Sequence, residues 1–172
     1  TRPGSHVYNR ALMASIIAHK GEDTAKTWGE NIVKNMARSP QGNDRDQIKA
    51  VIAGEGDLAI VNTYYIGKLL NSEDPEEVKV GLRIGVFFPN QDDRGTHINI
   101  SGAGVAKYAP NKANAIKFIE YLVNEDAQKV FASSNYEYPV NPAVEVSDLL
   151  KSWGIFKEDT LPLSKLGENN KK

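Results

Sequence analysis

Hydrophobic residues recur at helical spacing in three segments of the first third of the chain. Residues 5–21 predict one helix, with Ser5 as its N-cap and Gly21 as its stop. Residues 22–37 predict a second helix, because apolar side chains fall three or four positions apart at Ala25, Trp28, Ile32 and Met36. A third, shorter helix is expected to open at Asp44 and to stop at Gly54.

Two apolar runs that follow lack helical spacing and predict β-strands. These are LAIVN (58–62), which comes after a Gly-Asp turn, and RIGVFF (83–88). The residues between them predict a short helix that begins at Thr63 or Tyr64 and ends near Asn71. SEDPEEVK (72–79) is interpreted as a solvated acidic turn.

The second half of the chain starts with a Gly-rich, strand-like segment over residues 91–109. Residues 111–134 then predict a helix or a helix pair, residues 146–154 a short helix, and residues 168–172 a frayed tail. The alternation of strands and helices indicates an α/β fold, with a boundary between two lobes within residues 88–96.

The composition excludes several classes of function but says little about the fold. The 172 residues are 40% hydrophobic and 25% charged, as in ordinary globular proteins. The net charge of −1 gives no basic surface for nucleic acid. The absence of cysteine excludes thiolate metal sites and cysteine catalysis, and no Ser-His-Asp arrangement is evident, so an enzyme is not expected. The opening TRPGSHVYN reads like the interior of a domain, which suggests the C-terminal part of a longer protein.

Two adjacent tyrosines, Tyr64 and Tyr65, stand where the predicted strand meets the next helix. Neighbouring side chains diverge both in a strand and in a helix, so two phenol oxygens meet only at a bend. The crevice beyond the carboxyl ends of strands is also where open α/β sheets bind ligands. Ordinary packing of the two rings is the alternative, and the pair by itself does not exclude it.

A third tyrosine, Tyr8, lies in the first turn of the first predicted helix, where unsatisfied N–H groups favour a phenolate. Three phenolates would repel one another unless a strong cation lay between them. A hard trivalent ion such as Fe³⁺ prefers anionic oxygen ligands and would hold all three deprotonated. The chemistry therefore makes Tyr8, Tyr64 and Tyr65 a candidate Fe³⁺ site.

Several stretches of the chain resemble the ferric-ion-binding periplasmic proteins of bacterial iron ABC transporters. The resemblance covers nearly the whole chain and is carried by SHVYNRALMAS, ARSPQGNDRDQIKAVIAGEGDLAIVNTYYIG, FFPNQDDRGTHINISGAGVAKYAPNKANAIKFIEYL and NYEYPVNP. It implies a two-lobed, type II binding protein, present here only in part, that holds Fe³⁺ in the cleft between its lobes. Tyr8, Tyr64 and Tyr65 match the family's tyrosine ligands.

The same resemblance implies a division of the chain and a set of partners. Residues 1–88 would form the tyrosine-bearing lobe, residues 89–97 the crossing between lobes, and residues 98–172 the C-terminal portion of the other lobe. The N-terminal part of such a protein, which contributes a further ligand, is not in this sequence. A small anion such as carbonate is expected to complete the coordination, and an ABC permease is expected to receive the iron from the periplasm.

Polar residues near the tyrosines have candidate supporting roles. Asn62 is expected to orient a tyrosine oxygen, and Arg2 and Arg45 to hold an anion or to neutralise phenolates, with surface ion pairing as the alternative for both arginines. His6 is interpreted as a capping or exposed residue rather than a ligand. Two other functions stay open: a protein of the same fold that binds an organic or inorganic anion, and an interaction module whose tyrosines form a contact surface.

Overall fold

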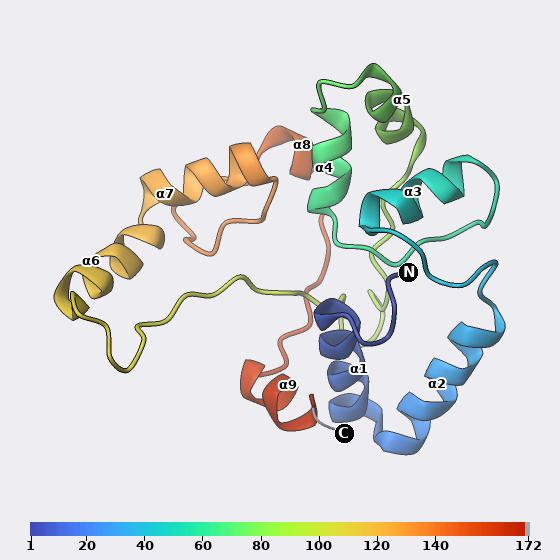
Figure 1. The fold of residues 1–172 in the computed structure, drawn as a ribbon, viewed down its shortest axis with the longest axis horizontal. Coiled ribbons are helices and arrows are strands. Elements are labelled where there is room, and N and C mark those ends of the chain that lie inside the picture. The colour runs from blue at the N-terminus through green and yellow to red at the C-terminus, as the bar shows by residue number, and fades with distance from the viewer. Residues whose placement is uncertain (171–172) are drawn as a thin grey trace.

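The computed structural model describes residues 1–170, and the regular elements within them are helices (Figure 1). Their bounds are α1 (Val7–Lys20), α2 (Glu22–Lys34), α3 (Asp44–Ile52), α4 (Tyr64–Leu70), α5 (Pro75–Arg83), α6 (Lys112–Leu122), α7 (Glu125–Val130), the π-helical turn η1 (Phe131–Asn135), α8 (Asp148–Ser152) and α9 (Leu163–Asn169). The predicted helix pair over residues 111–134 is confirmed as α6 and α7. The predicted tail is partly wrong, because Glu168 and Asn169 end α9; residues 171–172 lie outside the described residues.

Local hydrogen bonds set where the helices begin. The predicted N-cap Ser5 is wrong: His6 caps α1, and its Nδ1 accepts the Tyr8 N–H at 3.4 Å. Asn43 caps α3 through a capping box with Asp46, which leaves Asp44 as the first helical residue. The predicted acidic turn is also wrong, because Asp74 caps α5 and Pro75 occupies its first turn, where a missing N–H costs nothing.

The predicted strands at 58–62 and 83–88 do not form a sheet within residues 1–170. Apart from Arg83, which ends α5, these runs lie outside the helices, but no ladder joins them to another described segment. The Gly-rich segment contributes one isolated parallel bridge, between Thr96 and Glu158. Local pattern indicates which residues suit a strand, whereas a strand also needs a neighbour to accept its hydrogen bonds.

The helices gather in three groups (Figure 1). Helices α1, α2 and α9 lie together at one end, and α3, α4, α5 and α8 lie at the other. Helices α6 and α7 form an arm that is reached through the extended segment after residue 97. Helix α1 packs on α9, and α4 packs on η1, so segments from the two halves of the chain meet. The division into residues 1–88, 89–97 and 98–172 stays a prediction.

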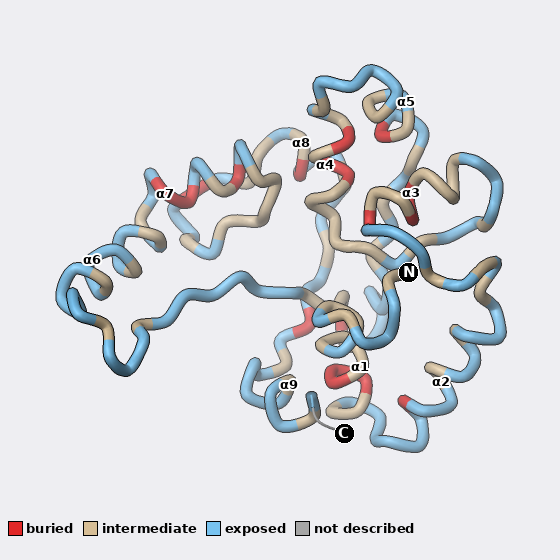
Figure 2. Tube along the Cα trace, in the orientation of Figure 1, coloured by how far each residue is buried: buried red, intermediate tan, exposed pale blue. Residues whose placement is uncertain are grey.

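The hydrophobic core is small. Its buried members are Ile48, Ile66 and Leu69, which join α3 to α4, and Trp153 packs against them from the end of α8. Figure 2 shows the buried positions as short, separate stretches of the trace rather than as one continuous interior. Large apolar side chains stay open to solvent, with Leu58 87% and Phe87 81% exposed. Part of a two-lobed protein would expose apolar surface of this kind, because the rest of the protein would cover it.

No helix among residues 1–170 combines the length and the apolar character that a membrane crossing would need.

Candidate metal centre formed by tyrosines

The structure brings Tyr8, Tyr64 and Tyr65 together from the first turns of two helices. The hydroxyl oxygens of Tyr8 and Tyr64 lie 2.9 Å apart, although 56 positions separate the two residues in the chain. The rings of Tyr64 and Tyr65 lie with their centroids 4.2 Å apart at an angle of 30°. Tyr65 also interacts electrostatically with both other tyrosines. Three phenols from α1 and α4 therefore share one small region.

The turn before α4 aims the two adjacent tyrosines. The Tyr65 N–H reaches the Asn62 carbonyl at 3.3 Å and the Ile66 N–H reaches the Thr63 carbonyl at 2.9 Å, so the chain bends directly after the extended segment. Thr63 holds the N-cap position without a side-chain cap bond. Ile66 and Leu69 bury one side of this helix, and Tyr65 packs against them, which fixes how the first turn presents the two tyrosines.

Without a metal, the phenols of α4 are held in their neutral form. Burial, followed by hydrogen bonding with Tyr65 and Tyr8, raises the pKa of Tyr64 well above its ordinary value. Burial is also the main cause that raises the pKa of Tyr65; its hydrogen bond with Tyr64 acts in the opposite direction, and the charge of Asp44 raises the pKa further. Only a strong positive charge at this place would make the phenolates favourable.

Sequence reasoning missed Asp44 as part of this region. Its side chain is 2% exposed, and its Oδ2 lies 3.3 Å from Nη1 of Arg2 without a well-aligned hydrogen bond to any described residue. Arg2 therefore reaches the neighbourhood of the tyrosines, paired with a buried carboxylate rather than free for an anion. The only signal in the sequence was the Asn-Asp pair at a helix start, which is typical of capping alone.

Lys68 is a second residue that the sequence reasoning missed. Its ammonium lies 5.0 Å from the centroid of the Tyr64 ring, one helical turn along α4. A tyrosine and a lysine four positions apart on a predicted helix are neighbours on its surface, so this signal was available in the sequence. The positive charge of Lys68 adds to that of Arg2 near the phenols.

Asn62 and Arg45 have other partners in the structure. The Asn62 side chain accepts a hydrogen bond of 2.9 Å from Asn99, which ties the approach to α4 to the extended segment of the second half. Arg45 lies 3.1 Å from Glu77, and Lys49 contacts the same carboxylate at 2.7 Å, so these charges link α3 to α5. For Arg45 this arrangement favours the ion-pair interpretation.

Gly67 lets a third aromatic residue approach α4 closely. A Cβ atom at this position would come within 2.4 Å of the ring of Tyr136, which itself has a left-handed backbone with φ of 59°. We expect Gly67→Ala to cost about 1–3 kcal/mol of unfolding free energy, because the added Cβ would meet the Cβ and Cγ of Tyr136, which cannot move away without their backbone. Chemical denaturation measures this. Gly104→Ala, at an open site, is the control, and an equal cost for the two variants would contradict the close approach.

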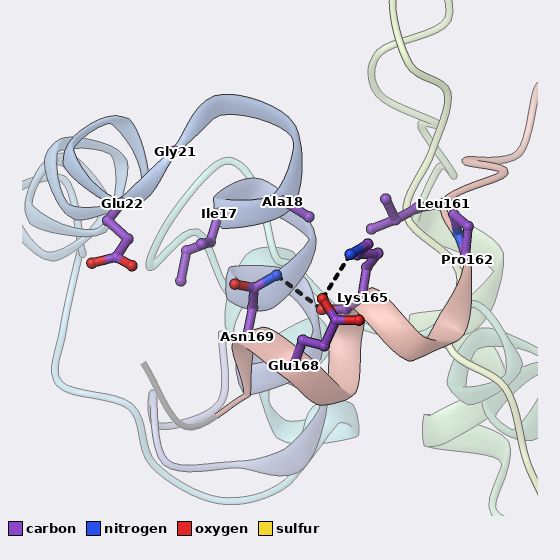
Figure 3. Close-up of a pocket in the computed structure, with 9 residues that line it drawn as sticks. All are labelled: Ile17, Ala18, Gly21, Glu22, Leu161, Pro162, Lys165, Glu168 and Asn169. Atoms are coloured by element: carbon purple, nitrogen blue, oxygen red, sulfur yellow. Dashed lines mark hydrogen bonds and ion pairs between the residues drawn. The ribbon is translucent and has the colours of Figure 1, made fainter.

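A cavity of about 710 Å³ lies elsewhere, between the end of α1 and helix α9 (Figure 3). Ile17 and Ala18 line it from α1, and the Lys165–Glu168 ion pair lines it from α9. It shares no residue with the tyrosine group, because Tyr8 is at the other end of α1. Within residues 1–170, no group of three or more histidine and carboxylate side chains is arranged to hold a metal.

Comparison with known proteins assigns the chain to a protein family. Residues 1–155 match the family described as bacterial extracellular solute-binding protein. The chain belongs to this family. It is 52% identical over 166 residues to iron uptake protein A1 of Synechocystis sp., an alignment that covers 96% of this chain and 46% of that relative.

Solved structures of the family confirm the fold. A ferric binding protein from Campylobacter jejuni superimposes with a TM-score of 0.96 at 48% identity, and a Trichodesmium protein (IdiA, FutA) solved in complex with iron and citrate does so with 0.94 at 49%. Each match covers 99% of this chain and 54% of the other. The predicted fold class is thus confirmed: the chain has the fold of a type II periplasmic binding protein and spans about half the length of these relatives.

Proposed function

We propose that this chain carries the Fe³⁺-binding tyrosines of an extracytoplasmic solute-binding protein, and that Tyr8, Tyr64 and Tyr65 bind the ion as phenolates. The observation that carries the proposal is the 2.9 Å contact between the hydroxyls of Tyr8 and Tyr64, with Tyr65 beside them. Two oxygens so close need only a small outward rotation to bind one ion from the same side. No catalytic role is proposed.

The chemistry of the donors selects the ion. Neutral phenols bind cations poorly. Tyr64 and Tyr65 have raised pKa values, so their deprotonation is unfavourable, and a divalent ion would offset little of this free energy. Fe³⁺ combines high charge with a preference for anionic oxygen, and it stays bound more tightly than Fe²⁺ for the same reason. Reduction is therefore the step that would release the iron.

Three phenolates leave coordination positions for other groups. A small anion such as carbonate would occupy part of this space. The remaining ligand would come from the N-terminal part of the protein, whose strands would also cover exposed residues such as Leu58 and Phe87. The closed, iron-bound form would then dock on an ABC permease from the periplasm.

The colour of the complex tests the proposal. A tyrosinate–Fe³⁺ bond absorbs visible light, so we expect a new band when ferric citrate is added to the 172-residue chain, and its loss when dithionite reduces the iron. Citrate alone and Zn²⁺ with citrate are the controls and should give no band. Binding of citrate without iron would favour the anion-binding alternative, and a colourless mixture throughout would contradict tyrosinate ligation.

A further inference from the structure

A buried polar cluster around Asp159 lies away from the three tyrosines and joins segments that are far apart in the chain. Asp159 is 5% exposed. Its Oδ2 accepts a hydrogen bond from the Ser15 hydroxyl at 3.1 Å and one from Arg94 Nη1 at 3.2 Å, and its Oδ1 lies 2.9 Å from His19 Nε2. Arg94 also donates to the Ser15 hydroxyl at 2.6 Å. One carboxylate therefore connects α1 to two other parts of the chain.

The same carboxylate sits where the two extended segments meet. The Thr96 N–H donates to the Lys157 carbonyl and the Asp159 N–H donates to the Thr96 carbonyl, both at 2.8 Å. Gly95 allows this pairing, because its φ is 92° and a Cβ there would come within 2.5 Å of the Glu158 carbonyl oxygen. The segments around 95 and 158 are thus fixed to each other, and Asp159 attaches both to α1.

The attachment point on α1 is aligned with Tyr8. Ser15 is completely buried and lies seven positions after Tyr8, which is close to two full turns of an α-helix. Residues seven apart therefore share one face of the helix, about 10.5 Å apart along its axis. His19 lies one further turn along on the same side. A helix held at Ser15 and His19 cannot rotate without turning Tyr8 as well.

The charges within the cluster make the attachment strong. Burial by itself would raise the pKa of Asp159, but hydrogen bonds from His19, the Leu161 N–H and Ser15 outweigh burial and lower the pKa. The carboxylate is therefore charged at neutral pH, and Arg94, whose side chain is 11% exposed, is its permanent cation. Loss of one partner would leave the others buried without compensation.

We infer that Asp159 is a positioning residue that fixes the rotation of α1 and, through it, the direction of the Tyr8 hydroxyl. Whether the direction of this hydroxyl matters for iron binding depends on the proposed function. The positioning itself needs no metal, so it is measured on the metal-free chain and fails or holds separately from the proposed iron site.

Asp159→Asn tests the inference, because it keeps the size of the side chain and removes its charge. We expect the amides of Thr96 and of the middle of α1 to exchange with solvent roughly ten- to a hundredfold faster, as loss of a charge-assisted hydrogen bond predicts. We also expect the ring signals of Tyr8 in NMR spectra of the folded variant to shift. A variant that is merely less stable keeps the ring signals of its folded state unchanged.

Asp93→Asn is the matched control, since Asp93 joins the same crossing segment to α1 through Lys20 at 3.2 Å but is 59% exposed. It should change neither measurement. If Asp159→Asn does not fold, Ser15→Ala tests the inference in its place, and we expect a smaller shift of the same Tyr8 signals. Tyr8 signals that stay in place in the folded variant, or exchange that accelerates equally along the whole chain, would overturn the inference.

Discussion

Replacing Tyr64 by Phe is expected to weaken Fe³⁺ binding by about a hundredfold or more, since loss of a ligand should exceed the roughly 10- to 100-fold typical of losing a group that only supports one. Tyr64 contacts both other tyrosines, so its hydroxyl occupies the middle of the proposed site. Phe keeps the ring, its packing on Tyr65 and its contact with Lys68, and removes only the oxygen. The fold should therefore survive while the metal is lost.

Competition against citrate, followed by the visible band, measures this change. Tyr108→Phe is a matched control, because Tyr108 also has a lysine over its ring, at 5.2 Å, yet is 84% exposed and far along the chain from the site. Tyr8→Phe and Tyr65→Phe should resemble Tyr64→Phe. Equal iron affinity in Tyr64→Phe and the parent chain, with circular dichroism unchanged, would remove Tyr64 from the site.

Acid is expected to release the iron. The pKa values of Tyr64 and Tyr65 are raised, so both phenols carry protons at neutral pH before the metal binds. Each must lose its proton to become a ligand, and protons therefore compete with Fe³⁺. These two protons alone make the affinity fall at least about a hundredfold for each pH unit lost, as long as the pH stays below both pKa values.

Proton release at constant pH measures the same linkage directly. Addition of Fe³⁺ as a chelate of known protonation should liberate at least two protons per ion, after correction for the chelate. The Tyr64→Phe variant should liberate one fewer, which assigns a released proton to that phenol. Binding that liberates none in the parent chain would show that the phenols are not ligands.

Local pattern predicted much of this molecule. Helix spacing located α1, α2 and α3, and the bend after Asn62 indicated where Tyr64 and Tyr65 would point. Local pattern could not predict whether residues 58–62 and 83–88 form strands, because a strand needs a neighbouring strand and local pattern does not reveal one. Asp74 followed by Pro75 is an ordinary signal for the start of a helix. The acidic residues around it led to the prediction of a turn instead.

The supporting residues of the site were harder to foresee because their partners are distant in sequence. Arg2 was expected to hold an anion, to neutralise phenolates or to form a surface ion pair; it pairs with the buried Asp44, 42 positions later, and nothing near Asp44 indicates that contact. Asn62 was expected to orient a tyrosine, yet its side chain meets Asn99. Residue types that favour a certain chemistry were readable from the sequence, whereas the pairings between them depend on the packing of whole helices.

The contact between Ser15 and Asp159 also bears on when the chain acquires its structure during synthesis. It joins residues 144 positions apart, and α9, which packs on the same helix, is made later still. Helix α1 therefore emerges from the ribosome long before the residues that cover it, with apolar side chains such as Ile16 still open to water. Contacts of such long range slow folding, because a large loop must close before they form. The tyrosine of α1 would thus reach its final place only after the residues around Asp159, translated much later, have been made.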